Sequence, residues 1–599
     1  MSDRTLFALF VASVNISPQA LTFDMSADIL IDMSASLHVG SPADSGLVPF
    51  DPASRARFRR EGWWTGRSLP AELVLAAEAS AGRPALVTPE VSWNYRDLLD
   101  EATRFGAGLA RVPGVAAGEA VMFQMGNVAQ TVVGYLGCLL AGARPVCTLP
   151  QHGSREIGLL AAHTGASCLI VQSDFRGGRL AAQARQLLSD GAVRSAVIAR
   201  GEPFSGAVSF DDVLSAGEGA GRVMLPFNVI DPGQIAVFQL SGGTTGLPKI
   251  APRLHEEYAY NSRAWAEVMG YGPDSVILYP LPVMHNAGIS LAVQPAIFAG
   301  SRLVLAPSAD IDELVTLIER YRPDVLPLVP PAVAIRLLDS PRARKADLSS
   351  ITDFVVGGQK LPAEIAERLR DELGIRVRQM FGMAEGMFTV TPAGAGQDIR
   401  HHTVGAPISP GDEVRILEPG GDEEIADGDI GELAARGPYT IRGYYRAAAH
   451  NSTAFTTDGF YRTGDLARRH RTGEGVFYSI EGRIKDVINR GVEKIHAEEV
   501  EELIIGHPSV AAAALVAMPD PILGEKGCVY LVLEAGAEQL TVTSLGRHLL
   551  AGGLAKYKLP ERVEIVPELP LTNVGKVSKK LLREDIERKL AAEAEEEET

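Results

Sequence analysis

The segment of this sequence best suited to chemistry is a loop rich in glycine and hydroxyl residues that ends in a lysine. It reads Ser241-Gly-Gly-Thr-Thr-Gly-Leu-Pro-Lys249 and follows an apolar run that is typical of a buried strand. Glycines let backbone N–H groups approach a ligand, hydroxyls add donors and lysine adds positive charge, so the loop is suited to a polyphosphate. It is not a P-loop, in which Gly-Lys-Ser/Thr runs straight into a helix, because Pro248 precedes the lysine. A solvated turn of glycine and threonine is the alternative interpretation of this segment alone.

Four further segments present groups that suit the rest of a nucleotide. Phe381-Gly-Met-Ala-Glu385 offers an aromatic face and a carboxylate, which together are able to stack a base and hold Mg²⁺ beside phosphates. Tyr461-Arg-Thr-Gly-Asp465 ends in a carboxylate suited to the two hydroxyls of a ribose. Residues 482–494 form a dense polar segment, and Thr572-Asn-Val-Gly-Lys576 is a loop that presents one lysine. Each has a simpler interpretation, because aspartate is a common turn residue and a loop lysine is commonly solvated.

The composition limits the class of protein. With 599 residues the chain is too long for one core, so we expect at least two domains. A net charge of −17 argues against binding to nucleic acid, whose phosphates carry the same sign. No apolar run has the length of a membrane span, and we expect no membrane partner. The four cysteines have no metal or redox spacing and are typical of buried thiols in a reducing compartment, so we expect a cytoplasmic protein.

The elements that must position these groups alternate between helical periodicity and short apolar runs. Helices are predicted over 94–109, where the pattern is amphipathic, and over 129–141. Helices that alternate with continuous apolar strands indicate an α/β fold with parallel-rich sheets, covered by helices on both faces. The strands are predicted at 85–88, 120–124, 167–171, 195–199, 275–278, 302–305 and 353–356.

The pattern changes after about residue 484. A helix over 497–504 is followed by strands over 510–516 and 528–533 and then by a basic helix that ends in glutamates. This indicates a small α+β domain of a size that folds on its own. We therefore predict an extension over 1–45 that is poorly ordered, a large N-terminal domain over 46–484, a small mobile C-terminal domain over 485–590 and a disordered acidic tail over 591–599.

In this order, the segments resemble the adenylate-forming superfamily, which includes acyl- and aryl-CoA synthetases, luciferase and the adenylation domains of peptide synthetases. The resemblance extends from about Val48 to Leu590. It is strongest to the stand-alone AMP ligases that load 2,3-dihydroxybenzoate or salicylate in siderophore assembly. The segments that carry it are Leu240-Ser-Gly-Gly-Thr-Thr-Gly, Val329-Pro-Pro, Val356-Gly-Gly, Phe381-Gly-Met-Ala-Glu-Gly386, Arg436-Gly-Pro-Tyr-Thr-Ile-Arg-Gly-Tyr-Tyr445, Ile488-Asn-Arg-Gly and Val574-Gly-Lys-Val-Ser-Lys-Lys580.

The resemblance implies a reaction in two steps that uses ATP and Mg²⁺. A carboxylate attacks the α-phosphate of ATP to give an acyl adenylate and pyrophosphate, and a thiol then displaces AMP. Adenine would stack on Phe381, Glu385 would bind Mg²⁺, and Lys576 would bridge the carboxylate and the α-phosphate as the main catalytic group. Asp465, assisted by Arg483, would bind the ribose hydroxyls. The implied ATP-binding set is Ser241, Gly242, Gly243, Thr244, Thr245, Gly246, Lys249, Gly358, Phe381, Gly382, Met383, Asp465, Arg483 and Lys576, and the implied catalytic set is Lys576, Glu385 and His285.

The resemblance also places a hinge at Lys485. The small domain would rotate about it, withdrawing Lys576 and bringing an acceptor loop inward for thioester formation. The related enzymes have a glycine at the position of Val492, beside the tunnel for pantetheine. A tolerated valine in a slightly displaced loop is the favoured interpretation, and slower thioester formation or another use of the adenylate is the alternative. The acceptor loop comprises Arg490, Gly491, Val492 and Lys494.

The acid-binding pocket follows from the pair His285-Asn286, which matches the aryl-acid ligases. There the asparagine binds the carboxylate and an ortho substituent, and its amide both donates and accepts, so an ortho-hydroxyl or ortho-amino group is compatible. Ala287 opens one side of the pocket, whereas Met387 and Phe388 close another. The predicted pocket consists of His285, Asn286, Ala287, Leu291, Gly357, Gly358, Gln359, Met387 and Phe388.

One pocket position argues against 2,3-dihydroxybenzoate. The dihydroxybenzoate enzymes are expected to have serine at the position of Leu291, and leucine leaves a 3-hydroxyl without a partner, at a cost of about 1–3 kcal/mol. Gln359 adds a polar group able to meet a ring nitrogen, an amine or a hydroxyl. Salicylate-like acids, anthranilates or larger heteroaryl acids are therefore favoured.

The sequence thus predicts an aryl-acid–AMP ligase that loads the phosphopantetheine thiol of an aryl carrier protein in natural-product biosynthesis. No carrier segment is recognisable after Leu590, so we expect the acceptor to be a separate molecule. An aryl-CoA ligase is the nearest alternative, and a non-catalytic nucleotide-binding homologue is the second. Glu385, Asp465 and Lys576 are all present, which argues against the second. We expect a monomer or a homodimer.

Overall fold

The computed structural model describes residues 45–222, 225–241, 249–490, 493–520, 523–552, 554–572 and 576–597. The extension predicted over 1–45 therefore lies outside the described residues, except for Ser45. Residues from Gly46 onward belong to one unit by their contacts. In this part of the chain, no helix combines the length and the apolar character that a membrane crossing requires.

A seven-stranded sheet is built from the first part of the chain, in the order β7-β6-β5-β3-β4-β8-β9. Its strands pair in parallel, apart from the antiparallel hairpin of β8 and β9. The central strands β3 (Ala120–Gln124), β5 (Cys168–Gln172) and β6 (Ser195–Ala199) are buried along their whole length, as expected for strands covered on both faces. The other strands are β4 (Arg144–Val146), β7 (Ala207–Ser209), β8 (Ile235–Ser241) and β9 (Lys249–Leu254).

A nine-stranded sheet follows the order β16-β15-β14-β13-β12-β10-β11-β1-β2. Its central strands are parallel, and antiparallel pairs occur at the two edges, between β1 and β2 and among β14, β15 and β16. The strands are β1 (Pro84–Val87), β2 (Ser92–Asn94), β10 (Val276–Tyr279), β11 (Arg302–Leu305), β12 (Val325–Val329), β13 (Asp353–Gly357), β14 (Val377–Met383), β15 (Gly386–Val390) and β16 (Ala406–Pro407).

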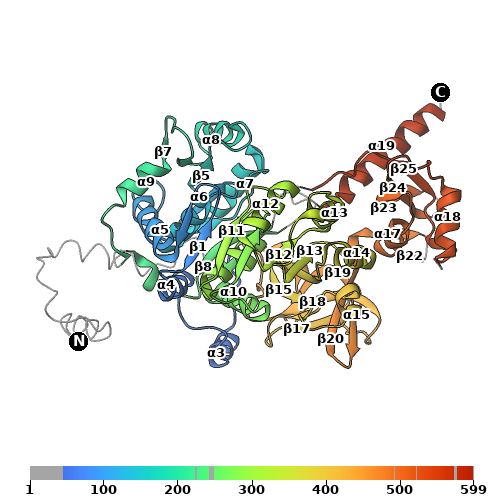
Figure 1. The fold of residues 1–599 in the computed structure, drawn as a ribbon, viewed down its shortest axis with the longest axis horizontal. Helices are drawn as coiled ribbons and strands as arrows, with labels where there is room; N and C mark the ends of the chain where they lie inside the picture. The colour runs from blue at the N-terminus through green and yellow to red at the C-terminus, as the bar shows by residue number, and fades with distance from the viewer. Residues whose placement is uncertain are drawn as a thin grey trace, which may run out of the picture. The chain divides into compact units, whose positions relative to one another are not determined.

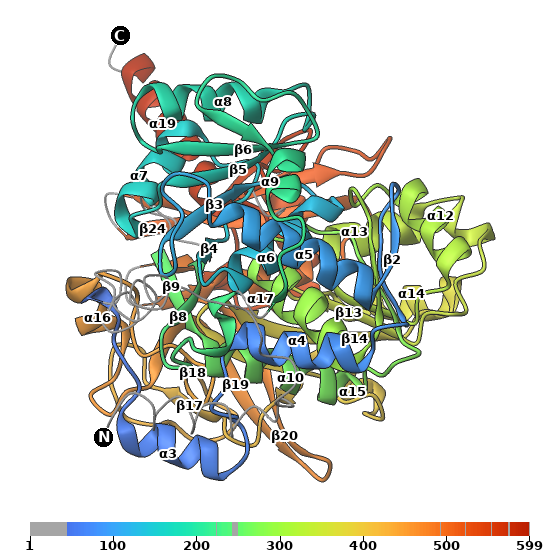
Figure 2. The same ribbon diagram turned by 90° about the vertical axis from the view of Figure 1, so that its left-hand side faces the viewer.

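Helices α5 (Tyr95–Leu109) and α6 (Ala129–Leu140) lie side by side and link the two sheets, since α5 contacts β1 and β2 while α6 contacts β4 (Figure 2). A capping box formed by Asn94 and Asp97 begins α5. The other helices before residue 410 are α3 (Pro52–Arg60), α4 (Leu69–Ala79), α7 (Ser154–Thr164), α8 (Arg179–Ser189), α9 (Phe210–Ala216), η4 (Pro226–Asn228), α10 (His255–Met269), the π-helix η5 (Gly288–Val293), α11 (Gln294–Ala299), α12 (Ile311–Tyr321), α13 (Pro331–Asp339), η6 (Ala343–Lys345), α14 (Ala363–Leu373) and α15 (Gln397–His402).

Two smaller sheets complete the chain. A four-stranded antiparallel sheet, β17-β18-β19-β20, precedes a five-stranded sheet, β22-β21-β24-β23, with β25 parallel to β24. Helices α17 and α19 pack on β23 in this last part, which draws its two hydrophobic clusters from residues after β20 (Figure 1). The elements are β17 (Glu413–Leu417), β18 (Ile430–Arg436), α16 (Ala448–Ala454), β19 (Tyr461–Thr472), β20 (Gly475–Arg483), η7 (Ile484–Asp486), β21 (Val487–Arg490), β22 (Glu493–His496), α17 (Ala497–Ile505), β23 (Val510–Asp520), β24 (Gly524–Leu533), α18 (Val542–Ala551), η8 (Lys556–Lys558), β25 (Arg562–Ile565) and α19 (Lys579–Glu597).

The α/β class predicted from the sequence is confirmed, with large parallel-rich sheets, covering helices and a smaller α+β part at the C-terminal end. The structure departs from the disorder expected of the acidic tail, because α19 continues to Glu597. Alanine and glutamate are strong helix formers, and the tail contains no glycine or proline to interrupt them. The helix, anchored by the buried Leu582 and Ile586, therefore continues through most of the tail.

Candidate active site

A β-hairpin closes the predicted phosphate loop. β8 and β9 pair with Ser241 opposite Lys249, so the first and last residues of the loop lie next to one another. The hairpin forms one edge of the seven-stranded sheet. Residues 242–248 lie outside the described residues, and with them the predicted contacts of Gly242, Gly243, Thr244, Thr245 and Gly246.

Glu385 connects this hairpin to the nine-stranded sheet. It lies in the turn between β14 and β15 and is buried. Its Oε1 accepts hydrogen bonds from the Ser241 Oγ and from the Tyr444 hydroxyl. The Tyr444 hydroxyl is also 2.8 Å from that of Tyr461, at the start of β19. These neutral donors orient the carboxylate without placing a cation on it, which leaves the group suited to a metal ion.

Lys249 is held by groups from the segment after residue 440. Its Nζ lies 2.7 Å from Nε2 of His450 on α16 and 5.2 Å from the centre of the Tyr444 ring. Burial lowers the pKa of His450, and the charge of Lys249 lowers it further. The ammonium therefore donates to a neutral imidazole. Burial also lowers the pKa of Lys249, whereas Glu385 opposes this effect.

Asp465 and Arg483 form a pair across two neighbouring strands. They lie opposite one another on β19 and β20, with Arg483 Nε 2.8 Å from Asp465 Oδ1. Burial raises the pKa of Asp465, while Arg483 and Lys576 lower it. The backbone N–H of Asp465 donates to Oγ1 of Thr463 over 3.0 Å, which fixes the turn before the carboxylate. The arrangement presents a buried, oriented carboxylate.

Lys576 reaches this site from the C-terminal part of the chain. A backbone bridge between Leu571 and Val577 closes its loop, and the Lys576 N–H donates to Oγ1 of Thr572 over 3.1 Å. A β-carbon placed on Gly358, just after β13, would lie 3.4 Å from Cε of Lys576 and 3.9 Å from Nζ. The lysine side chain therefore lies against the backbone at the carboxyl end of a parallel strand, where α/β sheets commonly bind ligands.

The electrostatics of Lys576 reflect this location. Burial and then the charge of Arg483 lower the pKa of Lys576 to about 8, while Asp465 opposes the shift. Burial, and then the charge of Lys576, lower the pKa of His285 to about 4, so this imidazole is neutral at pH 7. The charge of Lys576 is thus felt by groups distant in sequence, namely His285 and Asp465.

These donors fit a magnesium–nucleotide complex better than a metal bound by protein alone. Among the described residues, no group of three or more His, Cys, Asp or Glu side chains is arranged to hold a metal ion. Mg²⁺ beside phosphates needs only one or two carboxylates, because phosphate and water oxygens complete its octahedron. Glu385 has the chemistry of such a carboxylate, and the positively charged Lys249, Arg483 and Lys576 are suited to phosphates.

Asn286, which is predicted to bind the acid, is buried. Its Nδ2 is 3.5 Å from the carbonyl oxygen of Met383, and its Oδ1 accepts a hydrogen bond from the hydroxyl of Tyr258 over 2.9 Å. Ala287 precedes the π-helix η5, which contains the buried Leu291. A π-helix within an α-helical run is a local irregularity that frequently marks functional sites.

Met387 and Phe388, both predicted to close one side of the pocket, belong to different hydrophobic clusters. Phe388 packs at right angles on Trp265 and near the position of Gly382, where an added β-carbon would lie 2.5 Å from its ring. Met387 instead joins the hydrophobic cluster of the four-stranded sheet, with Leu433 and others. Met387 has a left-handed backbone, with φ of +54°, at the start of β15, where the pairing with β14 is irregular. Of the two residues, only Phe388 belongs to the hydrophobic cluster that contains Ala287 and Leu291.

The remaining predicted pocket and nucleotide residues follow the ends of β13 and β14. Gly357 ends β13 and is buried, whereas Gly358 and Gln359 are exposed just beyond it. Phe381 and Met383 lie at the end of β14 and pack partly against the cluster that contains Met387. Gly382, between them, shares its side of the strand with Phe388.

The hinge and acceptor-loop residues lie between β20 and β22. Lys485 belongs to the short helix η7, and Arg490 ends β21 with its Nε 2.6 Å from Glu561 Oε1. Gly491 and Val492 lie outside the described residues, as does the side chain of Lys494 in β22. The effect of Val492 on thioester formation therefore stays a prediction.

Three residues of the site were missed in the sequence. Tyr444 lies in a segment that carries the resemblance, yet its type alone indicates no role. His450 and Tyr258 meet their partners only through tertiary packing, and no local pattern marks them.

The sequence matches two protein families in succession. The family described as AMP-binding enzyme matches residues 74–445, and the family described as AMP-binding enzyme C-terminal domain matches residues 499–576. The first match contains Lys249, Asn286 and Glu385, and the second ends at Lys576.

Named relatives extend the match to nearly the whole chain. Pyochelin synthase PchD of Pseudomonas aeruginosa is 40% identical over 568 residues, which cover 92% of this chain and 100% of the relative. The 2,3-dihydroxybenzoate-AMP ligase of Bacillus subtilis is 38% identical over 548 residues, 91% of this chain and 99% of the relative. The apo structure of MbtA from Mycobacterium smegmatis is 34% identical, covers 91% of this chain and 100% of its own, and superposes with a TM-score of 0.69.

Proposed function

Since the chain belongs to the AMP-binding enzyme family, we propose that it activates an ortho-substituted aryl or heteroaryl acid and loads it on a separate aryl carrier protein. The chain is an adenylating ligase of a family that uses ATP with Mg²⁺. The relative named 2,3-dihydroxybenzoate-AMP ligase supports an aromatic acid as the substrate. The observation that carries the proposal is the approach of Lys576 to Gly358, within the same site as Asp465 and Glu385.

The nucleotide is assigned to the groups around the β8–β9 hairpin. The loop from Ser241 to Lys249 holds the β- and γ-phosphates, and Phe381 stacks on adenine. Asp465, oriented by its ion pair with Arg483, accepts hydrogen bonds from the two ribose hydroxyls. When bound at Glu385, Mg²⁺ neutralises charge on the phosphates and so lowers the barrier to attack by an anion.

The adenylation step needs positioning and charge more than proton transfer. A carboxylate oxygen forms a bond to the α-phosphorus, and the bond to the bridging oxygen breaks, so that its electron pair leaves with pyrophosphate. The attacking carboxylate is already ionised and requires no base. Lys576, approaching from the C-terminal part, donates to the oxygens on which negative charge develops, which is the kind of electrostatic stabilisation that accelerates such reactions most.

His285 and Asn286 are assigned to the acid. The Ala287 N–H donates to Nδ1 of His285 over 3.3 Å, so the neutral ring carries its proton on Nε2. We assign the Nε2–H of His285 as a donor to the bound carboxylate. Asn286 is assigned to the carboxylate and the ortho substituent, with Phe388 and Leu291 as apolar walls.

The test of adenylation is acid-dependent exchange between ATP and labelled pyrophosphate. The panel includes salicylate, 2,3-dihydroxybenzoate, anthranilate, 3-hydroxypicolinate and a quinoline carboxylate, with benzoate as the unsubstituted reference. We expect exchange with ortho-substituted acids and a rate near background with benzoate. Lys576→Ala, which removes the bridging cation, should abolish exchange while ATP still binds. Exchange with none of the acids, or full exchange in Lys576→Ala, would refute the proposal.

The acceptor is tested separately from the acid. With the best acid of the panel, thioester formation is compared between CoA and phosphopantetheinylated aryl carrier proteins. Faster transfer to a carrier protein is the expected result, and faster transfer to CoA would replace the proposal with an aryl-CoA ligase. If Val492 obstructs the thiol, Val492→Gly should accelerate this second step and leave adenylation unchanged. An unchanged second step would support the favoured interpretation of a tolerated valine.

A further inference from the structure

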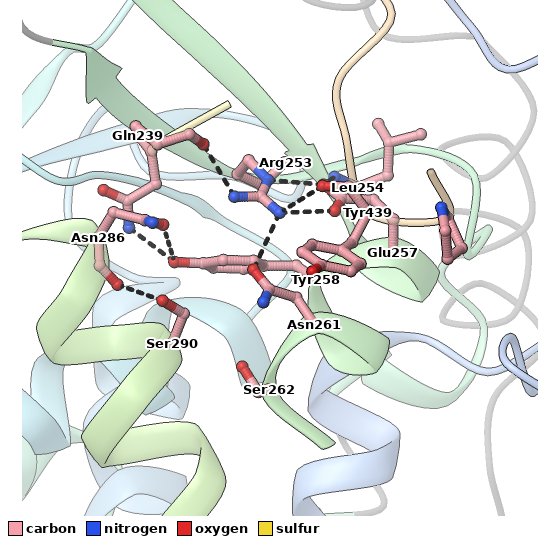
Figure 3. Close-up of polar contacts among 12 residues, drawn as sticks. Gln239, Arg253, Leu254, Glu257, Tyr258, Asn261, Ser262, Asn286, Ser290 and Tyr439 are labelled. Atoms are coloured by element: carbon pink, nitrogen blue, oxygen red, sulfur yellow. Dashed lines mark hydrogen bonds and ion pairs between the residues drawn. The ribbon is translucent and has the colours of Figure 1, made fainter. Parts of the chain in front are cut away.

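A buried chain of polar side chains leads from the seven-stranded sheet to Asn286. The Nε2 of Gln239 on β8 lies 2.9 Å from the Tyr258 hydroxyl, and that hydroxyl lies 2.9 Å from Oδ1 of Asn286. At the other end of the amide, Asn286 Nδ2 faces the carbonyl oxygen of Met383. Figure 3 shows the Tyr258 hydroxyl between Gln239 and Asn286. The adenylation chemistry makes no use of Tyr258.

The carbonyl of Met383 sets the direction of every hydrogen bond in this chain. A backbone carbonyl only accepts, so the nitrogen of the Asn286 amide must be the atom that faces Met383. The amide oxygen then faces Tyr258, which must donate its O–H to it. Because that proton is used, the Tyr258 oxygen accepts from Gln239. Reversing any one bond would place two donors or two acceptors face to face.

The tyrosine itself is held rigidly. The guanidinium carbon of Arg253 lies 4.5 Å from the centre of its ring, and Arg253 forms a fully buried ion pair with Glu257 over 2.8 Å. Arg253 also donates to the carbonyl oxygens of Ala384 and Tyr439, over 2.9 and 3.1 Å. One buried arginine thus contacts both Tyr258 and the turn next to Met383. Figure 3 shows Arg253 beside Tyr258 and Tyr439.

The two ends of the Asn286 amide differ in exposure. The bond between Oδ1 and Tyr258 is buried, whereas the contact of Nδ2 with Met383 is only partly buried. The Ser290 hydroxyl also donates to the backbone carbonyl of Asn286 over 2.7 Å, which holds the residue at the start of the π-helix. The amide oxygen is therefore turned into the protein, and the N–H donor is directed toward the partly exposed Met383.

The geometry points to Tyr258 as a positioning residue that makes Asn286 a hydrogen-bond donor and thereby selects acids with an ortho-hydroxyl over acids with an ortho-amino group. A phenolic oxygen has lone pairs that accept the Asn286 N–H. The nitrogen of an aromatic amine gives its lone pair to the ring, so its N–H groups would face another donor. This inference rests on the proposed function and narrows its substrate class.

The test compares Tyr258→Phe with a matched variant, Tyr135→Phe. Tyr135 is equally buried, and its hydroxyl likewise accepts from a glutamine, Gln294 Nε2, over 2.7 Å. Both variants remove a buried hydroxyl and leave one glutamine N–H without its acceptor, so any general loss of stability is shared. Both are characterised for kcat/KM in pyrophosphate exchange with salicylate and anthranilate, for the KM of ATP, and for binding of each acid by calorimetry.

The expected result is a change in selectivity specific to Tyr258. Wild type should prefer salicylate, and Tyr258→Phe should reduce the ratio of salicylate to anthranilate by about 10-fold in both kcat/KM and binding. The reason is that the amide loses its 2.9 Å bond to Tyr258 and is then oriented only by the long 3.5 Å contact with the Met383 carbonyl. The KM of ATP should change less than about 2-fold. Tyr135→Phe should keep the wild-type ratio.

Other outcomes overturn the inference in distinguishable ways. An unchanged ratio in Tyr258→Phe, or an equal change in Tyr135→Phe, would refute the role of Tyr258 and leave the proposed function intact. A wild type that prefers anthranilate would refute the donor assignment of Asn286. A wild type that binds neither acid and catalyses no exchange with any acid of the panel would refute the proposed function itself.

Discussion

The pKa of Lys576 gives a quantitative prediction for the pH dependence of adenylation. Burial lowers this pKa to about 8, and the positive charge of Arg483 adds to the effect. On the proposed assignment, the ammonium form is the active one, so activity is lost as pH rises through this pKa. Asp465 opposes the shift, and Lys485 adds to it.

The expected magnitude follows from the protonated fraction. With a pKa of about 8, about 3% of the free enzyme carries the Lys576 proton at pH 9.5, against about 90% for an ordinary lysine. The kcat/KM of pyrophosphate exchange, which reports on the free enzyme, should therefore fall about 30-fold from its plateau to pH 9.5. An unperturbed lysine would leave it nearly constant over this range.

The assay is pyrophosphate exchange between pH 6.5 and 9.5 with both substrates below their KM. Lys576→Arg should flatten the alkaline limb, whatever its plateau rate, because a guanidinium stays charged throughout. Lys580→Arg is the matched control on the half-exposed neighbour and should keep the limb near 8. A wild-type kcat/KM that stays nearly constant up to pH 9.5, or an alkaline limb near pH 8 that persists in Lys576→Arg, would refute the reasoning.

Three further predictions address the turn beside Glu385, the core and the pocket. Gly386→Ala should lower the free energy of unfolding in urea by more than about 3 kcal/mol, because φ is +110° and the new β-carbon would lie 2.0 Å from the Tyr439 oxygen. Gly420→Ala, with φ +83° and open space, should cost only about 1–2 kcal/mol, and equal losses would contradict the steric argument. Burial raises the pKa of Asp412 to about 8, so the folded chain keeps a proton that the unfolded chain releases above about pH 4. The free energy of unfolding should therefore fall as pH rises from about 4 to 8, by up to about 1.4 kcal/mol per pH unit. Asp412→Asn should flatten this slope in urea titrations. An unchanged slope would exclude Asp412 as its source. Leu291→Ser should raise exchange with 2,3-dihydroxybenzoate relative to salicylate by about 10-fold, and a constant ratio would refute the pocket argument.

Much of the fold could be predicted because its signals are local. The strand predicted at 120–124 is β3 to the residue, since five consecutive apolar or buried positions suit a strand covered on both faces. The helix predicted over 94–109 is α5, preceded by its capping residue Asn94. Such patterns depend only on residues that are close together in the sequence, so they can be recognised without the structure.

The parts that could not be predicted depend on neighbours in space. Met387 and Phe388 are adjacent, yet they belong to different hydrophobic clusters, and the left-handed backbone of Met387 cannot be read from the sequence. His450 is a partner of Lys249 across 201 positions of sequence. The direction of the Asn286 amide requires knowledge of the Met383 carbonyl and the Tyr258 hydroxyl together. No pattern in any one segment contains this information.

Lys576 differs from the carboxylates of the site in what stabilises its charge. The N-terminal groups that orient a nucleotide are already satisfied by one another, Glu385 by hydroxyls and Asp465 by Arg483, and need no ligand to hold their positions. Lys576 differs, because its depressed pKa means that the free site disfavours its charge. Two bound anions would restore the ammonium form, since an opposite charge nearby raises the pKa of a lysine. On the proposed assignment, the catalytic charge is therefore most stable only when ATP and the acid are both present, which couples the docking of the C-terminal loop to a filled site.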